Sequence, residues 1–212
     1  MSKIPQGEWN AIAARYQGGD RRDDKDLEQV HLVLGFPSVG YADPDYYAAS
    51  LLSTIVGGGM SSRLFQEIRE KRGLVYTIYA FGAAYEDGGL FGVYAGTGPS
   101  EIVELVPVVC DQLLGAIDKI DEGEIGRAKA QIKAGMLMSL ESTMSRAEQL
   151  GQHMLLFGRP IPTQEIIAKI DEIDVGALRR AAGKLFNSKP TIAAMGALGA
   201  LEPFDQTVRR FT

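Results

Sequence analysis

Few residues in this chain could carry hydrolytic chemistry. It has two histidines, His31 and His153, and one cysteine, Cys110. A zinc site built on one helix needs two histidines four residues apart and a carboxylate, because side chains at positions i and i+4 share a face. His31 and His153 are far apart in sequence and do not supply that pattern. An independent metal hydrolase that joins them to a carboxylate is kept as an alternative.

Nucleophilic catalysis has no sequence support either. There is no Gly-x-Ser-x-Gly motif, and Cys110 lies in the apolar run 106–114, which is typical of a buried thiol. The triple glycine 57–59 follows a helical pattern and precedes Met-Ser-Ser-Arg, whereas a phosphate-binding loop follows a strand and carries Gly-Lys-Ser/Thr. We interpret these glycines as a connection between two helices.

The composition is that of a globular domain with a sizeable core. Of 212 residues, 45% are hydrophobic and 23% charged, and the net charge of -5 comes from interleaved acidic and basic residues, so no nucleic-acid partner is expected. No stretch reaches the roughly 18 to 20 apolar residues of a membrane span, and residues 1–10 lack an apolar signal core. We expect a soluble protein of the bacterial cytoplasm, or of the mitochondrial matrix if the source is eukaryotic, with the periplasm left open.

The chain is expected to form a polar lead-in over residues 1–26 and a single α+β domain over 27–212. The lead-in ends in a charged cluster at 20–26. The apolar run from Val30 to Phe36 predicts a strand covered on both faces.

The next elements are two helices and a hairpin. Helical spacing over 46–56 and 61–72, the second ended by Gly73, predicts two consecutive helices. Strands are predicted over 74–84 and 90–97, joined by a Glu-Asp-Gly-Gly turn.

In the first strand of the hairpin both alternating sets of residues are apolar. Strict alternation places Leu74, Tyr76 and Ile78 on one face, and Val75, Tyr79 and Phe81 on the other. Each face is therefore expected to meet something, helices on one side and a partner on the other.

The remainder of the chain is mostly helical. Helices are predicted over 100–119, 121–141, 144–157, 163–170 and 174–186, before a closing strand at 190–197. This order predicts an α+β fold with a mainly antiparallel β-sheet layered with α-helices.

Residues 58–76 carry the most specific pattern. Together with 27–36, 90–97, 145–148 and 157–160, they make the chain resemble the C-terminal, non-zinc-binding half of the pitrilysin and mitochondrial processing peptidase family of zinc metallopeptidases. The resemblance runs from about Tyr16 to Leu201.

The resemblance implies an enzyme of two similar halves that enclose a chamber. The first half binds zinc through His-x-x-Glu-His and a later Glu, and that motif is missing here. The second half contributes an Arg and a Tyr seven residues apart that reach the substrate, and Arg69 and Tyr76 stand at that spacing. We therefore expect Arg69 and Tyr76 to bind substrate, no catalytic residue or metal ligand in this chain, and zinc in the partner half.

Two functional hypotheses follow from the resemblance. In the first, the chain is the substrate-binding half of a zinc metalloendopeptidase that cleaves peptides, and it is inactive without a zinc-binding N-terminal half or partner subunit. In the second, it is a non-catalytic structural protein similar to the core subunits of respiratory complexes. An isolated half would also expose its partner-facing surface, so a homodimer of the isolated domain is expected as well.

Overall fold

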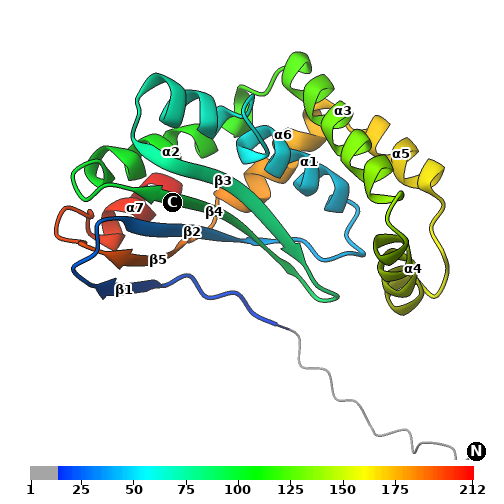
Figure 1. Ribbon diagram of the computed structural model, residues 1–212, viewed down its shortest axis with the longest axis horizontal. Coiled ribbons are helices and arrows are strands. Elements are labelled where there is room, and N and C mark those ends of the chain that lie inside the picture. Colours follow the sequence, from blue (N-terminus) through cyan, green and yellow to red (C-terminus); the bar gives the residue numbers. More distant parts are fainter. Residues whose placement is uncertain (1–13) are drawn as a thin grey trace, which may run out of the picture.

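The computed structural model describes residues 14–212, in which one curved sheet is layered with helices (Figure 1). The strand order is β1-β5-β2-β4-β3, and only the pair of β1 and β5 is parallel. The strands are β1 (Asp20–Asp24), β2 (Val30–Ser38), β3 (Val75–Ala84), β4 (Gly89–Thr97) and β5 (Thr191–Gly196). The α+β class with a mainly antiparallel sheet is confirmed.

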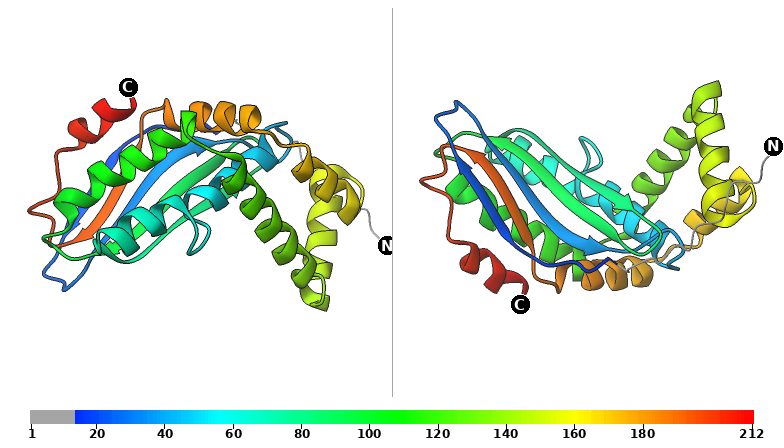
Figure 2. Two further views of the ribbon diagram at one scale, coloured as in Figure 1. Left: turned by 90° about the horizontal axis from the view of Figure 1, so that it is seen from above. Right: turned by 90° about the horizontal axis from the view of Figure 1, so that it is seen from below.

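The helices lie on one side of this sheet. They are α1 (Tyr46–Gly57), η1 (Phe65–Lys71), α2 (Ile102–Asp118), α3 (Glu122–Ser139), α4 (Thr143–Phe157), α5 (Thr163–Asp171), α6 (Val175–Phe186) and α7 (Phe204–Phe211). Figure 2 shows α1, α2 and α6 over the sheet, while α3, α4 and α5 extend beyond its edge. Within residues 14–212 no helix is long and apolar enough to cross a membrane.

The core lies between β2, β4 and the covering helices. In β2 the alternate residues Val30, Leu32, Leu34 and Phe36 are buried, and the Phe36 ring meets the ring of Phe186 with 5.3 Å between centroids. The residues between them are exposed or half-buried. Within residues 14–212 the strand is therefore covered on one face only, so in this part of the chain the expectation of two covered faces is wrong.

Strand β1 lies inside the segment expected to be a polar lead-in. Its charged side chains are held by the backbone of the C-terminal part: Arg22 Nη2 donates to the Glu202 carbonyl at 2.8 Å, and Asp24 Oδ1 accepts from the Leu198 N–H at 3.2 Å. Charged residues are common on edge strands because they discourage pairing with other chains. The sheet thus begins at Asp20, ahead of the boundary expected at residue 27, and residues 1–13 of the lead-in lie outside the described residues.

The predicted helix over 121–141 forms with its expected cap. Asp121 Oδ1 accepts from the Glu124 N–H at 2.9 Å, and the Glu124 carboxylate accepts from the Asp121 N–H at 3.0 Å. This reciprocal pair satisfies two N–H groups that have no partner within the helix. Helix α7 was not predicted.

Candidate functional site

The segment that carries Arg69 is a π-helix held at both ends. Leu64, its N-cap residue, and Ile68, within the helix, are fully buried. At its start the Arg63 guanidinium pairs with Glu124 of α3, with Nε 2.6 Å from Oε1. At its end Arg72 pairs with Glu104 of α2 at 2.8 Å. Anchored ends and a buried stripe fix which side of the helix faces outward.

Arg69 lies on that outward side. Its side chain is exposed, and its guanidinium carbon is 4.8 Å from the centre of the Phe65 ring, a cation–π contact. Among residues 14–212 the guanidinium has no hydrogen bond or ion pair, in contrast to Arg63 and Arg72. A guanidinium presents five N–H donors in a planar fork, so Arg69 is oriented by packing and keeps its donors available.

A glycine turn joins this helix to β3. Gly73 has φ of 65°, a left-handed conformation that costs other residues energy. The turn is closed by the Leu74 N–H, which donates to the Ile68 carbonyl at 3.0 Å, and Leu74 itself is buried. The path from Arg69 to Tyr76 is therefore fixed by one backbone conformation and one buried anchor.

Tyr76 stands at an irregularity of β3. Val75 pairs with Thr97 of β4 and Thr77 with Gly96, so Tyr76 is an extra residue with no partner. Such a bulge shifts the alternation of side chains. Val75 and Ile78 are both buried, whereas Tyr76 is 63% exposed. The prediction that Tyr76 shares a face with Leu74 and Ile78 is wrong because of this bulge.

Beyond the bulge, β3 and its neighbours carry aromatic side chains on the sheet face opposite the helices, which we call the open face. Its exposed or half-buried side chains include His31, Val33, Tyr79, Phe81, Tyr94 and Met195. The rings of Tyr79 and Tyr94 lie 5.1 Å apart, and the Tyr94 hydroxyl is 2.7 Å from His31 Nδ1. Seen from below in Figure 2, no helix of residues 14–212 covers this face.

The open face also contains a close approach at Gly92. A Cβ atom at Gly92 would lie 2.3 Å from Cζ of Phe81, so the ring of Phe81 occupies the space that a side chain would take. Phe81 and Gly92 are direct partners across β3 and β4. The glycine thus lets an aromatic ring lie flat against the sheet.

The two histidines are engaged separately. His153 Nδ1 accepts from the Ile161 N–H at 3.1 Å at the end of α4, whereas His31 contacts Tyr94 on β4. Among residues 14–212 no group of three or more His, Cys, Asp or Glu side chains could hold a metal ion. The described donors therefore do not fit zinc.

Cys110 is buried in α2, and its burial raises the pKa of the thiol to about 12. The nucleophilic thiolate is accordingly not formed near neutral pH.

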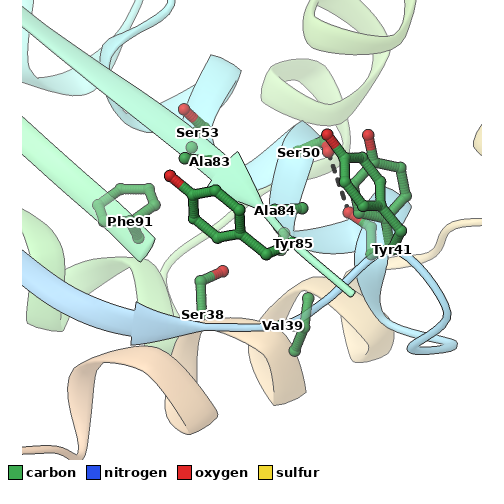
Figure 3. A pocket seen from close by; sticks show the side chains of 12 residues that line it. Ser38, Val39, Tyr41, Ser50, Ser53, Ala83, Ala84, Tyr85 and Phe91 are labelled. Atoms are coloured by element: carbon green, nitrogen blue, oxygen red, sulfur yellow. Dashed lines mark hydrogen bonds between the residues drawn. The ribbon is translucent and has the colours of Figure 1, made fainter. Parts of the chain in front are cut away.

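A cavity of about 420 Å³ lies at the far end of β3, between α1 and the hairpin turn (Figure 3). Its lining is neutral and rich in hydroxyl groups, from Tyr41, Tyr46, Tyr85, Ser38, Ser50 and Ser53. Burial raises the pKa of Tyr46, with the neighbouring tyrosines adding to the effect, and Ser50 Oγ donates to the Tyr46 carbonyl at 3.0 Å. Because the lining is neutral, the cavity is suited to holding an uncharged group. Its described lining contains no nucleophile with an adjacent base, so the lining itself offers no catalytic group. The sequence patterns gave no sign of it.

Comparison with protein families gives a match over residues 4–132 to the model described as the Peptidase M16 inactive domain. A protein of Rickettsia felis named as an uncharacterized zinc protease is 38% identical over 198 residues, which cover 92% of this chain and 48% of that protein. A second, from Streptomyces coelicolor, is 36% identical over 172 residues, which cover 81% of this chain and 38% of its own length. The chain spans about half the length of the curated relatives it matches.

Two solved structures share the fold. A chain in the structure of complex III2 from Candida albicans, bound to Inz-5, has a TM-score of 0.86 at 21% identity and covers 99% of this chain and 53% of its own. A conserved protein from Enterococcus faecalis has a TM-score of 0.75 at 24% identity, covering 86% of this chain and 42% of its own. The description of the matched domain as inactive agrees with the prediction that zinc is not held by this chain. The chain belongs to the M16 peptidase family, in which it matches the domain described as inactive.

Proposed function

We propose that this chain is the substrate-binding half of a zinc metalloendopeptidase that cleaves peptides in a chamber closed by a second, zinc-binding half. The proposal rests on the exposure of two side chains, Arg69 and Tyr76, and on their lack of a hydrogen-bonding partner in the described part of the chain. Both side chains are exposed and, among residues 14–212, neither has a hydrogen-bonding partner, although the backbone that carries them is anchored. Polar groups held in place without an internal partner are suited to an external ligand.

The chemistry of the two groups fits an extended peptide. A guanidinium donates two parallel hydrogen bonds to a carboxylate, or converging hydrogen bonds to a single carbonyl oxygen, and a phenol donates one more. In a chamber that excludes water, such donors also stabilise negative charge that develops on a peptide carbonyl oxygen. Arg69 and Tyr76 would thus bind and polarise the substrate, while the residues of this chain do not fit the metal. The ion would come from the zinc-binding N-terminal half or from a partner subunit.

The test is reconstitution with a metal-bearing half. The part of the Rickettsia felis relative that this chain does not match is the probe, and cleavage of a quenched fluorescent peptide is followed with and without this chain. Cleavage that requires this chain and weakens in Arg69→Ala and Tyr76→Phe supports the proposal. Full activity in both variants would reject the assigned roles.

The fold likeness to a chain of complex III2 supports a second candidate, a non-catalytic structural subunit. That candidate predicts stable assembly with a partner half and no cleavage by the assembled pair. The names of the bacterial relatives, which are called zinc proteases, favour the peptidase.

A further inference from the structure

Helix α4 is oriented with its polar side toward the protein. The partly buried positions are Ser145, Gln149 and His153, which are four residues apart and share one face. None of the 15 residues of the helix is buried. Four apolar residues lie on other faces and are more exposed: Met144 68%, Leu150 50%, Met154 48% and Leu155 88%. Leu156 and Phe157, beside the inward positions, are 37% and 38% exposed.

This orientation is the reverse of that of a surface helix. An amphipathic helix normally directs its apolar stripe to the core, because burying that stripe supplies most of its stability. Here the inward side makes a polar contact with the chain that follows the helix, since the His153 ring accepts from the Ile161 N–H. The apolar stripe therefore lacks a partner among residues 14–212.

The stripe lies at the outer end of the molecule and continues onto the preceding helix. Figure 2 shows α4 beyond the edge of the sheet, next to α3 and α5. At the end of α3, Leu137 and Met138 are 50% and 66% exposed. We call the exposed apolar residues of these two helix segments the outer stripe: Leu137, Met138, Met144, Leu150, Met154 and Leu155.

We infer that the outer stripe is an interface with the other half of a chain of the relatives' length. The chain spans 48% of the Rickettsia felis relative, so a protein of that kind holds a second body of similar size. This inference rests on the proposed two-half architecture, but not on the roles of Arg69 and Tyr76.

The size of the contact favours a covalently joined half over a second copy of the chain as the partner of the outer stripe. Helix α4, with 15 residues, is about 22 Å long and about 10 Å wide, so its part of the outer stripe offers on the order of 250 Å², to which α3 adds only Leu137 and Met138. Two free proteins need roughly 800 Å² from each partner for a stable complex. A covalently joined half has an effective concentration in the millimolar range, which makes a small contact sufficient.

The charge of α4 argues against a lipid surface as the partner of the outer stripe. Helices that bind anionic membranes carry many Lys and Arg residues on their polar face. Within α4 the charged residues are Arg146 and Glu148, which cancel, and the rest of the polar side is uncharged Ser, Thr, Gln and His. A neutral helix of this kind fits an apolar protein surface.

Hydrogen exchange tests the inference. This chain is measured free and joined to the unmatched part of the Rickettsia felis relative, and amide exchange is compared over residues 143–157. We expect at least tenfold slower exchange in the joined protein. In Leu155→Glu exchange should return to the rate of the free chain, because a carboxylate would then lie in the contact. Gln152→Glu is the matched control, since it places the same charge at an exposed position of α4 outside the outer stripe and should keep the slow exchange.

Equal exchange over 143–157 in the free and joined proteins would overturn the inference. So would protection in the free chain that grows with protein concentration, which would assign the outer stripe to a second copy, or protection by lipid vesicles. Leu155 is 88% exposed, so its substitution should leave the fold and the melting temperature of the free chain unchanged. Arg69→Ala should lower cleavage without affecting exchange in α4, and this separates failure of the interface from failure of the proposed function.

Discussion

The guanidinium of Arg69 lies over the aromatic ring of Phe65, one turn earlier in the same π-helix, with 4.8 Å between the guanidinium carbon and the ring centre. The ring orients the guanidinium without using any of its N–H donors. An arginine paired with a carboxylate, such as Arg63 with Glu124, has donors already committed. Packing on an aromatic face is thus a way to position an arginine for an external ligand.

Arg69→Ala should lower kcat/KM for peptide cleavage in the reconstituted pair by roughly 10²-fold, the usual effect of losing one donor to a developing oxyanion. Arg69→Lys should recover only part of the loss, because an ammonium cannot donate the paired hydrogen bonds of a guanidinium. Steady-state kinetics with a fluorogenic peptide measures both. The control is Arg72→Ala, which removes ion pairs with Glu67 and Glu104 and should affect stability more than kcat/KM.

Tyr76→Phe removes a single hydroxyl from a side chain that is 63% exposed. We expect roughly a tenfold lower kcat/KM, because one neutral hydrogen bond to the substrate is lost, and an unchanged free energy of unfolding. The matched control is Tyr79→Phe on the open face, which should have a smaller effect on cleavage. Equal effects of the two substitutions would show that the position at the bulge has no special role.

Gly73→Ala should destabilise the chain by about 1–2 kcal/mol, because a Cβ atom is disfavoured at a φ of 65°. There is open space around this glycine, so the cost comes from the backbone and not from a clash. Urea unfolding of the free chain gives the value. Gly199→Ala, a glycine without positive φ and also in open space, is the control and should be close to neutral.

The pH dependence of stability should include a contribution from Glu67. Hydrogen bonds from Lys71 and Arg72 lower the pKa of this carboxyl in the folded chain. A carboxyl whose pKa is lower in the folded state binds more protons when unfolded, so its contribution is present above the unfolded pKa of about 4.3 and is lost as the pH falls through the folded pKa. Unfolding measured between neutral and acid pH should show a smaller decrease for Glu67→Gln than for the parent chain. The effect should also weaken in high salt, because the pairs are near the surface.

Periodicity predicted the elements that position the site, but not the orientation of their side chains. The hairpin and the glycine that ends the preceding helix could be read from residue types alone. The bulge at Tyr76 could not, because both alternating sets of β3 are apolar and therefore fit more than one register. The pattern of α4 likewise defines an apolar stripe without showing whether it faces the protein. Strand β1 was missed because its charged residues are held by backbone groups more than 170 residues away.

The open face should cause weak self-association of the free chain. It exposes Tyr79, Phe81 and Met195 over several strands, and aromatic surfaces of this kind are typical of interfaces. Light scattering from micromolar to near-millimolar concentration should show a shift from monomer to dimer, and Tyr79→Asp should abolish it. Val103→Asp is the control, because Val103 is an exposed apolar residue of α2 at 58% and lies away from the open face. A strict monomer over the whole range would mean that an exposed aromatic sheet face is not sufficient for pairing, and that this face is reserved for a different partner.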